Sequence, residues 1–218
     1  MPRPRRLVPL LVALLCLALY AGFALNHPRE RPAPRPEVGV AALDRAVLAA
    51  RGTLESAMLV VNEPVSDPDL AGRVAARLGW GATPAAGEER TVAMGEELGG
   101  PVLRLNWRLT GSAAAGWAER YAALRAALAA EGVWPPIQVE LAGRSAEPGG
   151  PLELAHGSLD GVAAASRQPW SDERSASVAG WSPLLPPGPY EVNVQVAVRR
   201  QAGGSRFWIG WPAVRSDY

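Results

Sequence analysis

Few side chains in this 218-residue chain have the types and spacing that catalysis or metal binding requires. Its two histidines, His27 and His156, are far apart in the sequence, and Ser158 lacks the glycine pattern of a nucleophile elbow. Adjacent acidic residues, which more often solvate a turn than act as acid and base, occur at Glu88/Glu89, Glu96/Glu97 and Asp172/Glu173. The sequence therefore predicts no catalytic residue, no metal, no cofactor and no enzymatic activity. The alternative is a cell-wall hydrolase that uses one of these carboxylate pairs.

Binding is the chemistry for which the sequence offers better candidates, because two strand-like segments alternate apolar and polar side chains. Leucines and Trp107 alternate with polar residues over 103–109, and valines do so over 190–199. An exposed strand face that carries Arg, Asn, Gln and Trp can bind a glycan strand, a peptide or a partner protein. The candidate binding surface comprises Trp208, Arg199, Gln195, Asn193, Arg104, Asn106 and Arg108.

The tryptophans divide into two groups by their position in these patterns. Trp107, Trp117 and Trp211 fall on apolar stripes, which predicts that they belong to the core. Trp208 falls on the polar face by parity. Trp134 precedes two prolines in a predicted loop and is a second aromatic candidate for binding.

The last two strands, 190–199 and 205–211, are expected to form a hairpin. Gly203-Gly204 can supply the two positive φ angles of a two-residue loop. That turn places Arg199 opposite Trp208, a cation–π pair of about 0.5 to 1 kcal/mol when exposed. A loop two residues longer would place Arg199 opposite Arg206, and this pairing of like charges favours the tighter turn.

The remaining segments predict an α+β fold. Helices are expected from about residue 37 to a stop at Gly52 and at 66–78, 112–131 and 159–167, and further strands at 54–61, 89–94, 103–109, 137–141 and 175–181. Segment 54–61 is apolar on both parities near its end, which is typical of a strand buried on both sides. Ser112 is expected to cap the longest helix, and Gly149-Gly150-Pro151 to break the chain.

The order of these elements indicates an internal duplication. Residues 37–111 and 112–218 each follow the order helix, strand, helix, weak strand and strong strand, and short stretches recur at offsets of roughly 84 to 90 residues. Residues 103–109, for example, resemble residues 192–198. We therefore expect two halves that form antiparallel-rich sheet covered by helices on one side, with the polar strand faces of both halves on the other side.

The first 25 residues predict export. A basic start, Met1 to Arg6, precedes an uncharged apolar run from Leu7 to Leu25 whose length approaches that of a membrane-spanning helix. Residues 26–36 are rich in proline and arginine and are expected to be an extended tether. The rest of the chain is then extracytoplasmic on a single-pass anchor, or secreted if cleavage occurs near Ala24. Cys16, the one cysteine, is apolar filler inside the run, so no disulfide is expected.

The charge of the chain argues against a nucleic-acid partner. Its 22 basic residues are nearly balanced by 21 acidic ones, and the formal net charge is +1. Such a chain has no net field that would recruit a polyanionic duplex. The expected partners are instead the membrane, through the N-terminal segment, and an envelope protein or cell-wall polymer.

The C-terminal region resembles the YwmB family. The resemblance rests on Asn193-Val-Gln-Val-Ala-Val-Arg199, on Ile209-Gly-Trp-Pro212 and on the terminal Asp217-Tyr218. It implies an uncharacterised exported α+β domain of spore-forming Gram-positive bacteria, with a fold like that of the TATA-box-binding protein. The expected function is therefore binding of an envelope component or partner protein, with an association with sporulation implied by the family. DNA binding is suggested by the fold comparison alone.

Overall fold

The computed structural model describes residues 36–97, 99–146, 148–187 and 192–215, all of which belong to one compact unit, Pro34–Tyr218. The predicted signal segment and most of the predicted tether lie outside the described residues. Within the described ranges, no helix is both long and apolar enough to cross a membrane. The helices are α2 (Pro36–Ala49), α3 (Leu70–Arg77), the 3-10 helix η2 (Gly111–Gly116), α4 (Trp117–Ala130) and α5 (Pro151–Gly161). The strands are β1 (Gly52–Pro64), β2 (Glu88–Glu97), β3 (Gly100–Thr110), β4 (Gln138–Ser145), β5 (Ala165–Ser171), β6 (Ser175–Trp181), β7 (Val194–Gln201) and β8 (Gly204–Trp211).

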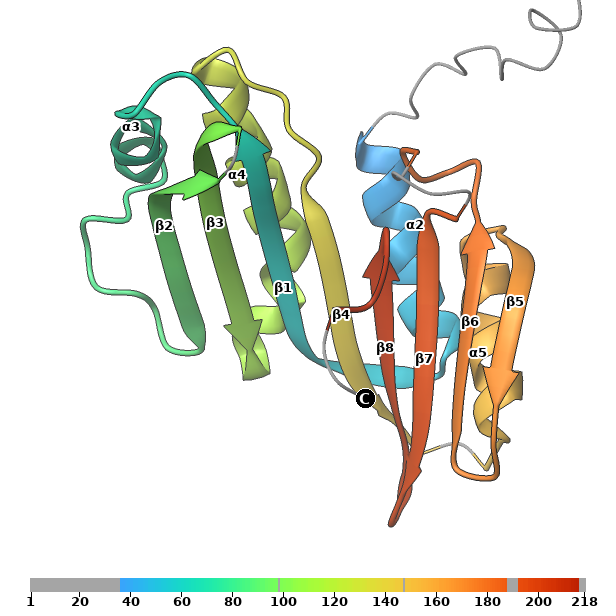
Figure 1. Ribbon diagram of the computed structural model, residues 1–218. Coiled ribbons are helices and arrows are strands. Elements are labelled where there is room, and N and C mark those ends of the chain that lie inside the picture. Colours follow the sequence, from blue (N-terminus) through green and yellow to red (C-terminus); the bar gives the residue numbers. More distant parts are fainter. Residues whose placement is uncertain (1–35, 98, 147, 188–191, 216–218) are drawn as a thin grey trace, which may run out of the picture. The chain divides into compact units, whose positions relative to one another are not determined.

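The strands form one antiparallel sheet in the order β2-β3-β1-β4-β8-β7-β6-β5 (Figure 1). The strands of the two predicted halves meet at the pair β1–β4, in which Ala57 lies opposite Leu141. Outward from β1 come β3 and then β2, and outward from β4 come β8, β7, β6 and β5. The predicted α+β class is confirmed, with four α-helices and one eight-stranded sheet in the described part of the chain.

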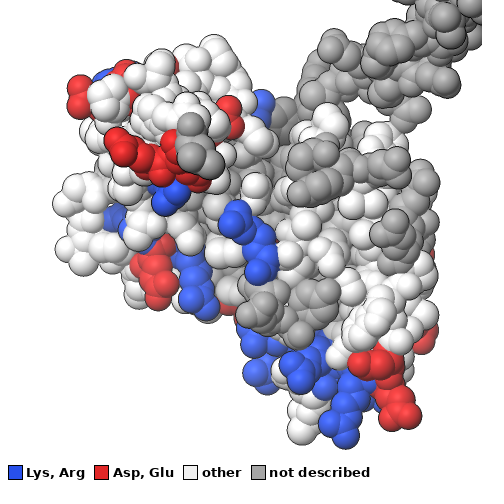
Figure 2. Space-filling model, in the orientation of Figure 1, with Lys and Arg blue, Asp and Glu red and all other residues white. Residues whose placement is uncertain are grey.

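The two faces of the sheet differ in what covers them. Helices α2, α4 and α5 lie against one face (Figure 1). The opposite face, called the open face below, carries the exposed side chains of β3, with Arg104, Asn106 and Arg108, and is turned toward the viewer in Figure 2. Strand residues of the other parity point to the helices, because successive side chains of a strand alternate between faces.

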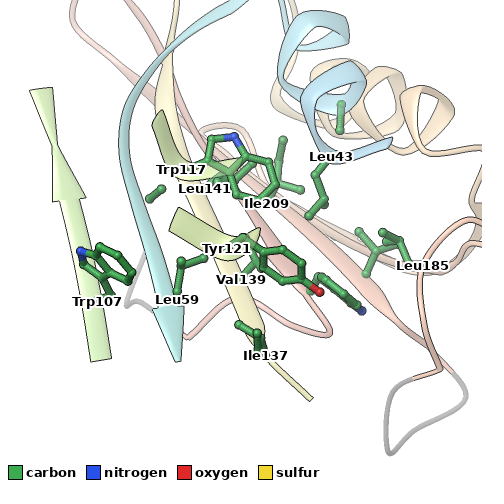
Figure 3. Packing of buried hydrophobic residues seen from close by; sticks show 14 of the residues in the cluster. Leu43, Leu59, Trp107, Trp117, Tyr121, Ile137, Val139, Leu141, Leu185 and Ile209 are labelled. Atoms are coloured by element: carbon green, nitrogen blue, oxygen red, sulfur yellow. The ribbon is translucent and has the colours of Figure 1, made fainter. Parts of the chain in front are cut away.

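The hydrophobic core fills the space between the sheet and the helices. Figure 3 shows Leu59, Val139, Leu141 and Ile209 on the sheet packing toward Tyr121 and neighbouring residues. The three tryptophans predicted to be core residues are buried, which confirms that prediction: Trp107, Trp117 and Trp211. Trp117 also donates a hydrogen bond from Nε1 to Oδ1 of Asp44 at 3.0 Å, which satisfies its polar atom at the edge of the core.

The helices make two contacts that cross between the predicted halves. α2 packs closely on α5, where a Cβ on Gly161 would lie 2.8 Å from the carbonyl oxygen of Arg45. After α4, Glu131 accepts hydrogen bonds from two residues of α3, from Nε of Arg73 at 2.7 Å and from Nε of Arg77. These hydrogen bonds hold the pKa of Glu131 below its ordinary value of 4.5. The helix before β1, α2, therefore contacts α5, and the helix before β4, α4, contacts α3. Each contact joins the first helix of one predicted half to the second helix of the other.

Two predictions about the segment after β4 are wrong. The predicted helix at 159–167 is instead α5, which begins at Pro151, and the break expected at Gly149-Gly150-Pro151 is the start of that helix. Proline is tolerated at the first helical position, because the N–H group that it lacks would have no carbonyl partner within the helix. Residues 165–171 form β5, which was not predicted. This edge strand contains Pro169 next to an irregularity in its pairing, which conceals the alternating pattern.

The central strand β1 and the start of α4 also differ from expectation. β1 is buried on one side rather than two: Leu59 and Val61 lie in the core, whereas Met58 and Val60 are half-buried on the open face. Ser112 does not cap an α-helix, because it lies within the 3-10 helix that precedes α4. The apolar run in β1 therefore reflects an interior strand of a sheet whose open face is only partly covered. It does not indicate a strand enclosed between two layers.

The C-terminal hairpin has a different turn from the predicted one. Gln201 pairs with Gly204, so the two-residue loop is Ala202-Gly203, and Gly203 has a φ of 83°. Gly204 is the first residue of β8, where a Cβ would lie 2.4 Å from the carbonyl oxygen of Ser145. The glycine is needed for this close approach to β4, and the predicted Gly203-Gly204 turn is wrong.

Two residues after α5 the chain has a residue whose backbone conformation favours glycine, which gives a test of the helix terminus. Ala163 has a φ of 52° and is exposed. Replacing Ala163 by glycine should raise the free energy of unfolding by about 0.5 to 1 kcal/mol, because a Cβ is strained in this region. Chemical unfolding measures the change. Ala123→Gly, at an exposed site inside α4, is the matched control and should lower stability by about 1 kcal/mol. If both variants lower stability, Ala163 does not have the strained left-handed conformation.

Candidate binding face of the sheet

The strand registers place most of the predicted binding residues on one face. Asn106 lies opposite Val60, which in turn lies opposite Gln138 of β4. Two residues further along β4, Glu140 lies opposite Gly210, which lies opposite Gln195 of β7. Because residues directly opposite each other, and residues two apart in a strand, share a face, the polar rows of β3 and β7 are both on the open face.

The residues of β3 are exposed as predicted. Arg104 forms an ion pair with Glu97 at 2.9 Å, and Arg108 lies 3.9 Å from a carboxylate oxygen of Glu89. Asn106 lies between the two arginines on the same parity. Exposed ion pairs of this kind contribute little to stability, so these side chains can change partners when a ligand approaches.

The C-terminal segment, Pro212–Arg215, runs across the middle of the open face. Val214 N donates to Oε1 of Gln195 at 3.1 Å, and Arg215 N donates to Oε2 of Glu140 at 2.6 Å. Gly210 makes this crossing possible, because a Cβ on it would lie 2.1 Å from the carbonyl carbon of Ala213. Gln195, a predicted binding residue, therefore holds the C-terminal segment in place and also donates to Oγ of Ser177.

Trp208 is not an exposed aromatic, contrary to the prediction. Its side chain is on the open face but only 6% exposed, in a small cluster with Ala142, Ala197 and Val214. The guanidinium of Arg206, and not that of Arg199, lies over its ring, with 5.1 Å from Cζ to the centroid. Parity assigned the right face to Trp208, but it could not show that the chain folds back over β8.

Asn193 is not a surface residue either. It precedes β7 and is 0% exposed. Its Nδ2 donates to the carbonyl oxygens of Ser182, Leu185 and Pro186 at 2.9 to 3.2 Å, and its Oδ1 accepts from Ser182 N at 2.7 Å. The buried amide of Asn193 therefore acts as a clamp, a set of hydrogen bonds that fixes the loop after β6 from inside the protein. The prediction that Asn193 belongs to the binding surface is wrong.

A hollow of about 320 Å³ lies in the open face between the two ends of the sheet. Small side chains, Ser56 and Ala142, lie at the central strand pair, while Arg108 of β3 and Arg206 of β8 line its two sides. Glu140 also contributes to the lining. The combination of arginine, carboxylate and amide groups suits a polar ligand that both donates and accepts hydrogen bonds.

Two arginines of this face, Arg206 and Arg144, were not among the predicted site residues. Arg199 lies opposite Arg206 in the β7–β8 pair, and Arg206 lies opposite Arg144 in the β8–β4 pair. The exposed Arg199 therefore belongs to a row of three arginines and does not face Trp208 as predicted. The longer-loop register considered from the sequence contained the Arg199–Arg206 pair, but like-charge repulsion argued against it.

The acidic pairs do not form a site with two cooperating carboxylates. Glu88 accepts two hydrogen bonds from Arg120 of α4, whereas the adjacent Glu89 faces Arg108 on the open side. Oδ1 of Asp172 accepts hydrogen bonds from backbone N–H groups of its own turn. Among the described residues, no group of three or more His, Cys, Asp or Glu side chains could hold a metal ion. His156 lies in α5.

The loop tryptophan, Trp134, is 70% exposed between α4 and β4. Trp134 stays a candidate contact residue, although it lies outside the strands that form the open face.

No protein-family model and no curated protein sequence matches this chain.

Proposed function

We propose that this chain is a membrane-tethered, extracytoplasmic protein of the bacterial envelope that binds an envelope component or partner protein through the open face. The observation that carries the proposal is the hollow between Arg108 and Arg206, on the face that the helices leave uncovered. Its volume is at the lower end of the range found for ligand sites, which suits one sugar unit or a few side chains of a partner. No catalytic step is part of the proposal.

The location follows from the N-terminal sequence. Residues 1–25 act as a signal anchor, or as a signal peptide if cleavage occurs near Ala24, and residues 26–36 link the anchor to α2. An 11-residue extended tether reaches at most about 40 Å, so an anchored domain stays close to the membrane surface.

An internal duplication accounts for the order of the strands. β1 and β4 are each preceded by a helix and followed by a helix, and they pair with each other where the strands of the two halves meet. The last strand of each half, β3 or β8, lies next to that central strand. The counterpart of β3 by sheet position is therefore β8 rather than β7, which changes the alignment proposed from residues 103–109 and 192–198. The hollow is bordered by one arginine from each of these corresponding strands.

Membership of the YwmB family, with its implied link to sporulation, remains part of this proposal on the strength of the C-terminal residues quoted above. A nucleic-acid partner is not proposed. The open face carries Glu89, Glu97 and Glu140 among its arginines, and a continuous acidic backbone would meet these carboxylates.

The test compares two variants of the full-length protein in mild detergent. The double variant Asn106→Ala/Arg108→Ala removes exposed groups of the open face, and Arg125→Ala on α4 is a control on the helix side of the sheet. Wild type and the control should co-sediment with washed envelope fragments, and the double variant should bind at least fivefold more weakly. Equal binding by all three proteins, or binding by none, would overturn the proposal.

A further inference from the structure

Three arginines lie side by side at one end of the open face. Arg144 of β4, Arg206 of β8 and Arg199 of β7 are directly opposite one another in consecutive strand pairs. Neighbouring strands are about 4.8 Å apart, so the three Cα atoms span only about 10 Å. Figure 2 shows basic side chains gathered at this end, below the centre of the face. This set of three residues is called the arginine row.

The arginine row is costly for the fold, because like charges directly opposite each other in a sheet are destabilising. One carboxylate offsets it: Glu55 forms an ion pair with Arg144 at 2.9 Å. No acidic side chain among the described residues lies within 4.0 Å of the guanidinium nitrogens of Arg199 or Arg206. Two adjacent positive charges thus lack an acidic partner within the described part of the protein.

Arg206 is held in position by its surroundings. Its guanidinium stacks over Trp208, and its Nε atom is buried without a hydrogen-bond partner in the described part of the chain. Stacking of this kind fixes the plane of the guanidinium and reduces the entropy lost when it binds an anion. Arg199 lies exposed beside Arg206, so its side chain is free to move toward Arg206. The two guanidinium groups can then form a site for one anion between them.

We propose that Arg199 and Arg206 together bind a phosphate group of an envelope polymer, with Arg144 flanking the site. A carboxylate is satisfied by a single guanidinium in a two-pronged pair, whereas the several oxygens of a phosphate can accept from two guanidinium groups at once. The inference rests on the proposed function, since the arginine row borders the hollow of the same face through Arg206.

The position of the row favours a polymer over a lipid headgroup. The β7–β8 turn and the end of β4 lie at one end of the sheet, and the first turn of α2, where the N-terminal segment joins, lies at the other end (Figure 1). The row is therefore on the side of the domain away from its attachment point. A nucleic-acid duplex is disfavoured because it needs a longer basic track than about 10 Å, given its charge every 1.7 Å along the axis.

The experiment uses inorganic polyphosphate as the probe and the full-length protein in zwitterionic detergent. Calorimetric titration should give binding by wild type, and Arg199→Gln and Arg206→Gln should each weaken it at least tenfold. Arg200→Gln is the matched control. Arg200 is the next residue on β7, it points to the other face, and it donates to the carbonyl oxygen of Gly149, so its loss should change the affinity less than twofold. Equal weakening by Arg199→Gln and Arg200→Gln would overturn the proposal.

Three further measurements distinguish binding of a phosphate polymer from a structural role of the row, from binding of lipid or DNA, and from binding of free phosphate. Thermal unfolding of Arg199→Gln should occur at an equal or higher temperature than in wild type, because a repulsive pair is removed; a lower temperature would indicate a structural role and overturn the site. Binding to phosphatidylglycerol vesicles or to duplex DNA that equals binding to polyphosphate would overturn the choice of polymer. Free inorganic phosphate at the same phosphate concentration should bind more weakly, since it lacks neighbouring groups for Arg144.

The outcomes separate this inference from the proposed function. If Arg199→Gln binds polyphosphate as wild type does, but Asn106→Ala/Arg108→Ala loses its envelope binding, the phosphate site alone is wrong. If polyphosphate binding depends on the arginine row while no variant affects envelope binding, the phosphate site stands as chemistry and the proposed function fails.

Discussion

Replacing Asn193 by alanine is expected to lower the free energy of unfolding by about 3 kcal/mol, because each buried polar group left without a partner costs roughly 1 to 3 kcal/mol. The amide of Asn193 bonds three carbonyl oxygens and one backbone N–H of the loop after β6. Alanine would remove all of these hydrogen bonds at once. In the same loop, Oγ of Ser182 donates to the carbonyl oxygen of Val162 at the end of α5, so the loss extends to the packing of that helix.

Urea unfolding of Asn193→Ala and two companions measures this effect. Asn193→Asp keeps the shape and the acceptor atom but loses both donor hydrogens, and it turns a carboxylate toward three carbonyl oxygens; it should be at least as unstable as the alanine variant. Asn106→Ala, the same change at the exposed site on β3, should alter stability by about 0.5 kcal/mol or less. A loss below about 1 kcal/mol in Asn193→Ala would mean that water replaces the amide and that the clamp is dispensable.

The features that could be predicted from the sequence are those encoded in local periodicity. Arg104, Asn106 and Arg108 alternate with core residues in β3, and this period of two gave both the strand and its exposed side. The same reasoning assigned the correct face to Trp208. Because the pattern of one strand carries information about parity alone, it could not predict which residues of another strand lie opposite.

The features that could not be predicted depend on contacts between distant segments. Asn193 continues the polar parity of β7, yet it lies just before the first residue of that strand, and the loop after β6 encloses its side chain. The register of the hairpin depends on Ser145, 59 positions before Gly204, because the close approach of β4 requires a glycine there. Repulsion between Arg199 and Arg206 was a valid argument of about 0.2 to 1 kcal/mol, which the packing of the core residues in β7 and β8 outweighs.

The second large effect is expected at Gly210, where valine should displace the C-terminal segment from the open face. A Cβ at this position would lie 2.1 to 2.3 Å from backbone atoms of Ala213 and Val214, and backbone cannot yield as a flexible side chain can. We expect a loss of about 2 kcal/mol, within the range of 1 to 3 kcal/mol for overpacked sites. Gly72→Val, at an exposed site in α3 with no atom within 4 Å, is the matched control and should not lower stability.

Tryptophan fluorescence distinguishes displacement of the segment from a general loss of packing. Trp208 is covered by Val214, so Gly210→Val should shift the emission to longer wavelength, and adding Trp208→Phe should abolish the shift. A chain that ends at Trp211 should show the same shift without the steric clash. If the truncated chain keeps the emission of wild type, the segment does not shield Trp208, and the instability of Gly210→Val arises within β8 itself.

Displacement of the segment also bears on what the open face can hold. Arg215 donates from its backbone N to Glu140 and from Nη1 to Gln138 at 2.6 Å each, so the segment occupies acceptor groups of the central strand β4. Removing it would free these acceptors and extend the hollow that Arg108 and Arg206 border. Stronger envelope binding by the truncated chain would therefore mean that the segment competes with the ligand. Weaker binding would mean that the segment, by covering Trp208, keeps Arg206 in the position that the ligand requires.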